Sequence, residues 1–439
     1  MVHNGVLIIG GGAAGLAAAL RLSGEGVPVG ILEGRERLGG RMHTIHSDPK
    51  CLLVELGAEF IHGEQNTTWD YVKSAKLRTQ KVPDRHWRFV KGELLKDRKL
   101  WDRISSVMSR INEAAPDQDF QSFVDHGWGI DPLARNLALE YAENFHAAPA
   151  NRISVHALAL AEEAAEKDEA TSQFRIKAGY CGLVDWFTRQ LAAREIPVYL
   201  NNTVKVIRWQ RGRVDVITQA GMQEQHWQAE RAVITLPLGV LQNQRGAGAV
   251  QFDPLLHTKQ KAIEGLAMGS VFKMTLHFKS RFWKRNFGFI HVNNPWLPVW
   301  WSDSRGPLIT AWAGGPRAEQ LAREGPQAAL AVAFRLLASL FKIAPQKLND
   351  NLLGCYTHDW MQDPFACGAY SYTPVRMKDM PRRLAMPVAE TLFFAGEATD
   401  SQGEQGTVHG ALASGERAAE EVLHSIQCGQ ETIPVISSR

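Results

Sequence analysis

The chain has 439 residues, 49 basic and 46 acidic side chains, and a formal net charge of +3. Its hydrophobic content of 45% and charged content of 22% are typical of a globular protein of about three domain-sized units and exclude a disordered, collagen-like or coiled-coil chain. The balanced charge argues against nucleic acid as the main partner, and the apolar runs are too short to predict a membrane span.

The five cysteines are scattered and have neither CxxC nor metal-finger spacing. An odd number of scattered cysteines in a long chain predicts reduced thiols, no disulfide framework and no metal site. We therefore expect a cytoplasmic protein. The sequence leaves its oligomeric state open.

The N-terminal segment has the pattern of a dinucleotide-binding βαβ unit. Val6–Gly10 is an apolar run that predicts a strand buried on both faces, and the glycine-rich stretch after it leads into small and apolar residues at helical spacing. Val27–Leu32 predicts a second strand, which ends in Glu33. The spacing from Gly10 to Glu33 (33 − 10 = 23 residues) is near the ~20 expected of this unit.

Each residue type in this unit suits a bound dinucleotide. Gly10 allows the tight turn, Gly12 lets the backbone approach a pyrophosphate, and Gly15 lets helix and strand pack closely. The helix N-terminus attracts the anion. Glu33 can accept hydrogen bonds from a ribose and would repel a 2′-phosphate, so the unit disfavours NADP and leaves NAD and FAD as alternatives.

The segment from Glu33 to Arg41 resembles the extension that follows this unit in flavin-containing amine oxidases, the family of monoamine oxidases, polyamine oxidases and lysine-specific histone demethylases. The C-terminal segment resembles the same family. Thr391–Ala395 predicts a buried strand, Glu397 follows it, and a glycine-rich loop leads to a helix that starts at Thr407. The resemblance implies one FAD site built from both ends of the chain, with Arg41 along the pyrophosphate, Glu397 near the ribitol and the last helix pointing its N-terminus at the flavin.

The cofactor-binding residues that this resemblance implies are spread over the whole chain. One of them, Val204, would pair its backbone with the adenine. The full set is Gly10, Gly12, Ala14, Gly15, Glu33, Arg35, Gly40, Arg41, Gly57, Ala58, Glu59, Val204, Trp360, Gly396, Glu397, Gly406, Thr407 and Val408.

Two stretches between the FAD segments differ in character. Residues 85–170 are rich in helix formers and predict a helical insertion, for example at Ala157–Ala170, whereas residues 265–350 begin with strand alternation at Val271–Phe278 and end in a helix at Pro326–Phe341. We predict an α/β fold in which a Rossmann-type FAD-binding domain is intergrown with a mixed α+β substrate-binding domain. The FAD-binding domain would comprise 1–80, 175–262 and 352–439, and the substrate-binding domain 81–174 and 263–351.

Lys273 lies within the predicted strand between Phe272 and Met274. A lysine in an apolar strand usually faces solvent. The segment from Gly269 to Phe278, however, resembles the family strand whose lysine holds a water beside the flavin, and this resemblance implies a catalytic role for Lys273. Burial there would lower the pKa of the lysine.

Three further residues are implied to form the amine site. His62 lies in a segment, Leu56–Gly63, that resembles a family stretch passing near the flavin, and we expect it to titrate near neutral pH and to contact an amine or order water. A structural histidine is the alternative. Trp360 and Tyr370 would line the site beside the flavin ring.

Two positions separate this chain from typical monoamine oxidases. Ala369 stands where those enzymes carry a flavin-linked cysteine, so we expect non-covalent FAD, although Cys367 is close by. Thr407 stands where they complete a pair of tyrosines.

The sequence therefore predicts an FAD-dependent amine oxidase, with polyamine-like substrates favoured. It would oxidise a primary or secondary amine to an imine that water hydrolyses, with O2 reduced to H2O2. L-amino acid oxidase and monoamine oxidase activities are alternatives on the same scaffold, and a desaturase or a flavin-holding interaction protein without turnover is a weaker one. The expected partners are a small amine and O2, without nucleic acid or membrane.

Overall fold

The computed structural model describes residues 5–49, 51–168, 172–284 and 287–431. Its N-terminal βαβ unit is part of a parallel five-stranded sheet with the order β10-β2-β1-β14-β23. All four residues of β1 are buried, as expected for a strand covered on both faces. The strands are β1 (Val6–Ile9), β2 (Val29–Leu32), β10 (Val198–Tyr199), β14 (Arg231–Ile234) and β23 (Leu392–Phe394).

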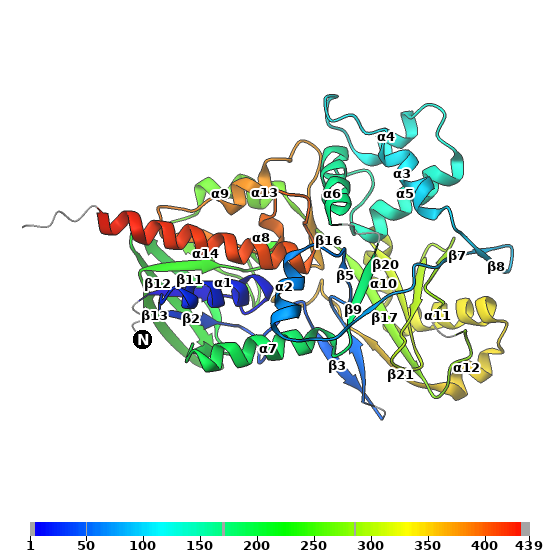
Figure 1. Ribbon diagram of the computed structural model, residues 1–439, viewed down its shortest axis with the longest axis horizontal. Coiled ribbons are helices and arrows are strands. Elements are labelled where there is room, and N and C mark those ends of the chain that lie inside the picture. The colour runs from blue at the N-terminus through cyan, green and yellow to red at the C-terminus, as the bar shows by residue number, and fades with distance from the viewer. Residues whose placement is uncertain (1–4, 50, 169–171, 285–286, 432–439) are drawn as a thin grey trace, which may run out of the picture.

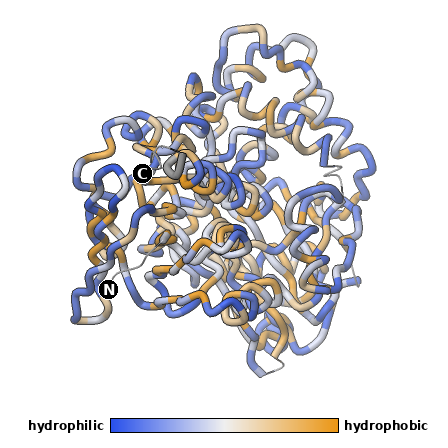
Figure 2. The backbone as a smooth tube through the Cα atoms, turned by 60° about the vertical axis from the view of Figure 1, so that its left-hand side comes forward, coloured by the Kyte–Doolittle hydropathy of each residue, from blue (hydrophilic) through white to orange (hydrophobic). Residues whose placement is uncertain are grey.

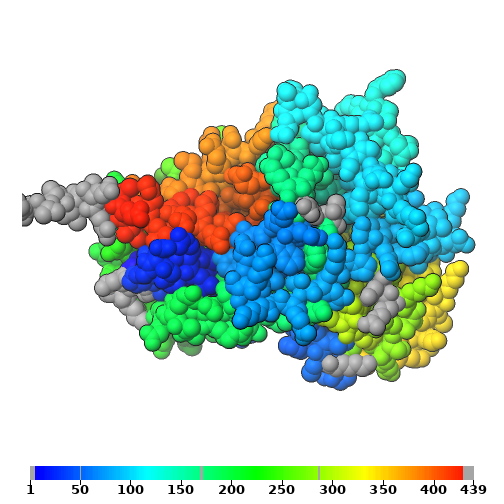
Figure 3. All heavy atoms as spheres, viewed as in Figure 1, coloured from blue at the N-terminus to red at the C-terminus, as the bar shows by residue number. Residues whose placement is uncertain are grey.

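The two ends of the chain pack against each other on this sheet. Helix α1 (Ala13–Gly24) lies beside the C-terminal helix α14 (Val408–Glu431), as the blue and red segments show in Figures 1 and 3. A Cβ at Gly415 of α14 would lie 2.1 Å from the carbonyl oxygen of Ala14, so only glycine permits this approach. The first and last segments of the chain therefore pack together on one sheet.

A second, seven-stranded sheet stands beside the first domain, with the order β21-β17-β20-β19-β18-β7-β8. All eight positions of its strand β17 are buried. Helix α11 packs a row of buried apolar residues against the sheet. The elements are β7 (His86–Val90), β8 (Glu93–Lys96), β17 (Val271–Phe278), β18 (Phe289–Val292), β19 (Val299–Ser302), β20 (Leu308–Gly314), β21 (Leu352–Thr357), α10 (Pro316–Glu324), α11 (Pro326–Phe341) and α12 (Pro345–Asn351).

The predicted helical insertion over 85–170 is only partly helical. Residues 86–96 form the hairpin β7–β8, and β7 pairs in parallel with β18, about two hundred residues further along the chain. The helices that follow form a separate layer at the upper right of Figure 1, around a core that includes Phe120 and Leu158. They are α3 (Leu100–Met108), α4 (Phe120–His126), α5 (Pro132–Phe145) and α6 (Val155–Lys167). Ala170, the predicted end of the last helix, lies outside the described residues.

The predicted domain boundary at 352 is too early, because β21 pairs with β17 and belongs to the second sheet. The FAD-binding portion resumes after Thr357.

Small sheets and short helices complete the fold. They are β3 (Thr44–Ser47), β4 (Leu52–Glu55), β5 (Ile61–His62), β6 (Thr79–Lys81), β9 (Gln173–Ile176), β11 (Thr203–Gln210), β12 (Arg213–Ala220), β13 (Gln223–Ala229), β15 (Gln251–Asp253), β16 (Ala267–Gly269), β22 (Tyr370–Tyr372), α2 (Thr67–Ser74), α7 (Gly179–Ala193), α8 (Leu238–Gln242), α9 (His257–Gly265), α13 (Met380–Ala385) and the 3-10 turn η1 (Glu397–Thr399).

Figure 2 shows hydrophobic and hydrophilic residues interspersed along the backbone. Within the described part of the chain, no helix is by itself long and apolar enough to cross a membrane. Helices α11 and α12 would qualify only as a pair, and they meet at a bend of 113°.

Candidate active site

A cavity of about 480 Å³ is lined by residues of the parallel sheet, the seven-stranded sheet and the helical layer. The cavity wall contains every predicted catalytic residue (Lys273, His62, Trp360 and Tyr370) and every predicted cofactor-binding residue except Gly15. Segments from residue 9 to residue 411 therefore meet around one space.

The glycine-rich turn leaves room for an anion at the start of α1. Gly10 has φ +110°, and a Cβ at Gly15 would lie 2.0 Å from the carbonyl oxygen of Gly10, so Gly15 serves helix–strand packing and does not reach the cavity. A Cβ at Gly12 would meet nothing within 4 Å. Gly12 is also the N-cap of α1 and offers no side-chain cap. The helix N–H groups therefore remain available to a pyrophosphate.

Glu33 closes the βαβ unit with a buried carboxylate. Its two oxygens accept hydrogen bonds from the backbone N–H groups of Gly11, at 2.7 Å, and Arg35, at 2.8 Å. Burial raises the pKa of Glu33, and these two hydrogen bonds oppose the rise. A carboxylate has about four acceptor positions, so Glu33 retains capacity for a ribose hydroxyl.

Arg35 lines the cavity, but its guanidinium is held by another protein residue. It forms a two-pronged ion pair with Asp363, at 2.8 and 2.7 Å, and lies 5.3 Å from the ring centre of Phe365. His358 Nε2 lies 2.7 Å from the same carboxylate. Burial alone would raise the pKa of Asp363, but His358 and Arg35 hold it well below its usual range. Arg35 thus positions the loop after β21, a contact that the sequence did not indicate.

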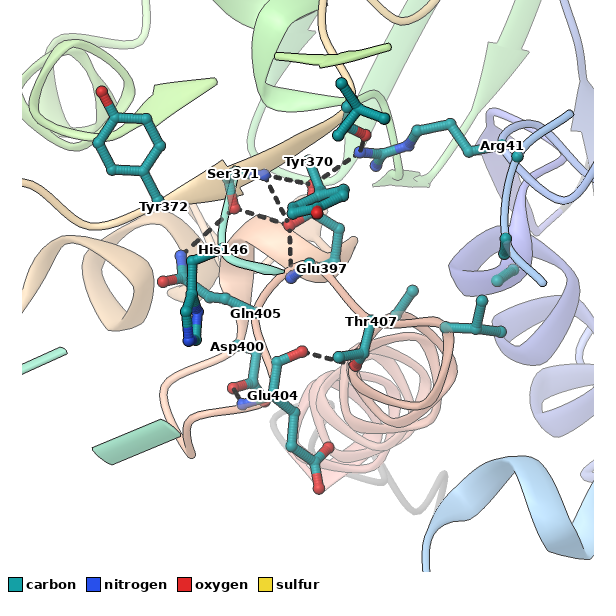
Figure 4. A pocket seen from close by; sticks show the side chains of 18 of the residues that line it. Arg41, His146, Tyr370, Ser371, Tyr372, Glu397, Asp400, Glu404, Gln405 and Thr407 are labelled. Carbon is teal, nitrogen blue, oxygen red and sulfur yellow. Dashed lines mark hydrogen bonds and ion pairs between the residues drawn. The ribbon is translucent and has the colours of Figure 1, made fainter. Parts of the chain in front are cut away.

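Glu397 is the centre of a buried polar group where the chain ends meet. Arg41 Nη1 donates to Glu397 Oε1 at 2.9 Å and to the carbonyl oxygen of Ala369 at 2.7 Å. Glu397 Oε2 accepts from Ser371 Oγ at 2.7 Å and from the Gly406 N–H at 3.0 Å. Figure 4 shows Arg41 and Ser371 converging on Glu397. The carboxylate that was expected to contact ribitol therefore also joins three segments of the protein.

Lys273 is buried, with 4% of its surface exposed. Its Nζ forms an ion pair with Glu59 Oε2 at 2.7 Å and donates to the Gly57 carbonyl oxygen at 3.1 Å. The apolar strand thus turns its lysine into the cavity and not towards solvent.

Glu59, which was predicted to bind the cofactor, uses its carboxylate to hold Lys273. The same carboxylate accepts from Arg175 Nε at 2.8 Å and from Trp301 Nε1 at 3.0 Å. Burial would raise the pKa of Glu59, but Lys273 and Arg175 hold it at about 2. Glu59 lines the cavity chiefly as the counter-charge of Lys273.

His62 lines the cavity, but it does not titrate near neutral pH as expected. Burial lowers its pKa to about 4. Its ring lies edge-on to Phe145, with the ring centres 5.4 Å apart. At neutral pH it therefore presents an uncharged imidazole.

Replacing His62 with glutamine should flatten the pH dependence of stability. As the pH falls from about 6.5 to 4, His62 becomes protonated in the unfolded chain but stays neutral in the folded chain. The free energy of unfolding of the wild type therefore falls by about 1 kcal/mol per pH unit relative to that of His62→Gln. Urea unfolding of both proteins at several pH values measures this difference. A constant difference between them would contradict the buried, neutral state of His62.

Trp360 and Tyr370 are fixed by hydrogen bonds to the backbone. Trp360 Nε1 donates to the Leu56 carbonyl oxygen at 3.1 Å, and the Tyr370 hydroxyl donates to the Phe145 carbonyl oxygen at 2.8 Å. Thr407 Oγ1 accepts from the Gly410 N–H at 2.9 Å and caps α14, as its position at the helix start indicates.

The thiol nearest to Ala369 points away from the cavity. Cys367 Sγ contacts Asn243 Nδ2 and the Pro364 carbonyl oxygen, each at 3.6 Å, and Cys367 is absent from the cavity wall. This placement agrees with flavin held without a covalent bond.

Several cavity residues were missed because the sequence reasoning assigned them no role. One group consists of the facing histidines of β7 and β18 together with the aromatic rings beside them. The second group consists of Asp168, Glu404 and His409, whose side chains lie close together. Members of both groups come from segments far apart in sequence, so their local sequences carried no signal. The first group is His86, Trp101, Phe289, His291 and Trp301.

Comparison with known proteins places this geometry in a family. The family model described as flavin containing amine oxidoreductase matches residues 13–423. The chain belongs to this family. It is 28% identical to lysine-specific histone demethylase 1 homolog 2 of Arabidopsis thaliana, over 96% of this chain and 59% of that protein, so it spans about three fifths of that relative's length. It is 27% identical to probable polyamine oxidase 4 of the same plant, over 95% of this chain and 87% of that protein.

Solved structures of the family share the fold. A putrescine oxidase bound to putrescine aligns with a TM-score of 0.79 at 18% identity, over 97% of this chain and 99% of that one. Cyclohexylamine oxidase from Brevibacterium oxydans aligns with a TM-score of 0.80 at 19% identity, over 97% of this chain and all of that one.

FAD is the cofactor that membership of this family assigns. The residues present suit it, because the start of α1 is open at Gly12 and uncapped by a side chain, and Glu33 stands at the end of the second strand. Val408, the first residue of α14, also lines the cavity, so a second helix N-terminus faces the same space. Positive helix ends stabilise the phosphates and the electron-rich ring of a bound flavin.

Proposed function

We propose that the protein is an FAD-dependent amine oxidase that converts a primary or secondary amine to an imine, which water hydrolyses to an aldehyde and an amine or ammonia. O2 would be the electron acceptor and H2O2 the product. The observation that carries this proposal is Lys273, a buried lysine held by Glu59 in the wall of the cavity that also contains the glycine-rich turn and the start of α14.

The protein's own contribution is positioning and electrostatics. Bound FAD supplies the two-electron acceptor, and the chain supplies a shielded cavity in which Trp360 and Tyr370 orient the amine. His62 is uncharged there, so it does not repel a cationic amine. Lys273 can hold a water through its ammonium hydrogens, while Glu59 fixes its direction.

The cavity favours cationic substrates without a carboxylate. Two arginines line it within the described residues, Arg35 and Arg41, and each is already paired with a buried carboxylate. An L-amino acid oxidase would need an arginine for the substrate carboxylate, so this alternative is weaker. Besides Glu33, Glu59 and Glu397, the carboxyl groups of Glu140, Asp168, Asp400 and Glu404 line the cavity and suit ammonium groups. Burial and the neighbouring Asp400 raise the pKa of Glu404 to about 7, which an adjacent ammonium group would lower. These features, with relatives named as polyamine oxidases, support a diamine or polyamine.

A panel of amines tests the proposal. H2O2 release should be greatest with spermine, spermidine or putrescine, and lower with tyramine, L-amino acids and a methyl-lysine peptide. The peptide is included because other relatives are named as histone demethylases. Anaerobic mixing with the same amines should bleach the flavin. A flavin that no amine bleaches would instead support the interaction protein without turnover.

We also propose a cytoplasmic location and no membrane or nucleic-acid partner. All five cysteines lie in the described part of the chain and none of them is in a disulfide bond, which suits a reducing compartment. Fractionation of the native cells, followed by detection of the flavoprotein, tests the location.

A further inference from the structure

An aromatic wall leads away from Lys273 inside the cavity. Lys273 Nζ lies 5.8 Å from the ring centre of Trp301, and the ring centres of Trp301 and Phe289 are 6.1 Å apart. His86 stacks on Phe289 at 5.4 Å. All of these residues line the cavity, and so does His291, which contacts His86. The wall therefore joins the expected catalytic lysine to a pair of histidines.

The two histidines form a chain of polar contacts that reaches the surface. His86 Nδ1 lies 3.0 Å from His291 Nε2, and His86 Nε2 lies 2.9 Å from Asp84 Oδ1. The Asp84 side chain is 60% exposed, whereas that of His86 is 8% exposed. Burial lowers the pKa of both histidines, to about 3 for His291, so both rings are neutral at pH 7. The nearby charged groups that act on them are Asp84, Asp97 and Arg88.

The carboxylate of Asp84 sets the direction of these hydrogen bonds. An ionised carboxylate only accepts, so His86 must donate through Nε2 and accept through Nδ1. His291 must then donate through Nε2. Its Nδ1 therefore carries no proton and keeps a lone pair that can accept a hydrogen bond. The Trp101 indole N–H lies 3.2 Å from the same His86 Nε2 and could donate to it only in the other tautomer. The contact with Asp84 is shorter and charge-assisted, so we assign the proton to His86 Nε2, and the Trp101 N–H is then not hydrogen-bonded to His86. Among the described residues, no hydrogen-bond partner stands at His291 Nδ1.

We propose that His291 Nδ1 is the acceptor for an N–H group on the second nitrogen of a diamine or polyamine. This inference rests on the proposed function. The substrate's carbon chain would lie along Phe289 and Trp301, while its reacting nitrogen stays near Lys273. A protonated second nitrogen is also attracted by the aromatic faces of the wall. Asp84 and His86 are positioning residues, because they act only by fixing the tautomer of His291.

His291 lies in register with Lys273 three strands away, at a strand separation of about 14 Å. Substitutions at His291 therefore test the subsite with a matched pair of long substrates, octane-1,8-diamine and octylamine. His291→Phe keeps an aromatic ring but removes the acceptor, so kcat/KM for the diamine should fall about tenfold, the effect of one hydrogen bond to a charged group. The value for octylamine should stay unchanged. His291→Gln, which can donate to His86 and accept from the substrate, should restore most of the preference for the diamine.

Asp84→Asn should lower the same preference, because an amide can donate to His86 Nε2 and reverse the tautomers. Asp102→Asn is the control, because Asp102 is an exposed carboxylate on α3. Binding of octane-1,8-diamine, read from the flavin absorbance change without oxygen, tests the subsite separately from turnover and so separates its failure from that of the proposed function. Equal losses for both amines, no loss in His291→Phe, or a diamine preference that depends on Glu404 and not on His291 would overturn the inference.

Discussion

Replacing Lys273 with methionine should slow amine oxidation at least about tenfold while FAD stays bound. The change removes the cation but keeps a side chain of similar length in the buried strand β17. Lys273 Nζ is within 2.7 Å of Glu59, so the variant also leaves this carboxylate with Arg175 and Trp301 as its remaining partners. Stopped-flow absorbance separates flavin reduction by the amine from reoxidation by oxygen and shows which step carries the loss.

Lys81→Met is the control for this variant. Lys81 also forms an ion pair with a glutamate, Glu64, at 3.2 Å, but its side chain is 58% exposed. Removing this charge should leave both rates unchanged because exposed ion pairs contribute little. Wild-type rates in Lys273→Met would refute the role of the lysine, and loss of FAD in that variant would show that the residue holds the cofactor site together.

Local sequence patterns predicted several individual elements in both sheets. The glycine-rich turn, β17 at Val271–Phe278 and α11 at Pro326–Phe341 all follow from periodicity and from breakers a few residues away. In each of these segments the burial pattern depends on one strand or helix and its immediate neighbours, which is the information that sequence patterns contain.

Local sequence patterns contain no information on contacts between distant segments, so these contacts were not predicted. The hairpin β7–β8 was taken as part of a helical region because its strand character depends on pairing with β18. Likewise, Arg35 and Glu59 were predicted to bind the cofactor. Both line the cavity, but their charges are neutralised by Asp363 and Lys273, each more than two hundred residues away. The titration of His62 was mispredicted for the same reason, since its pKa depends on burial by the folded chain.

Replacing Glu397 with alanine should have the largest effect on the folded state. The carboxylate is 4% exposed and accepts from Arg41, Ser371 and Gly406. Its loss would leave a partly buried guanidinium without its counter-charge and several N–H and O–H groups unpaired. We expect the free energy of unfolding to fall by about 3 kcal/mol, and FAD to be lost because these three partners come from separate cavity-lining segments.

Glu390→Ala provides the matched comparison, since Glu390 pairs with Arg211 at 2.6 Å while both side chains are more than half exposed. Urea unfolding should show no change for Glu390→Ala, and the flavin absorbance of the purified protein should match the wild type. Glu397→Gln separates charge from packing, because the amide retains one acceptor but cannot neutralise Arg41. If stability and flavin content both survive in Glu397→Ala, then the contacts among α1, α14 and the parallel sheet hold the chain ends together without this carboxylate.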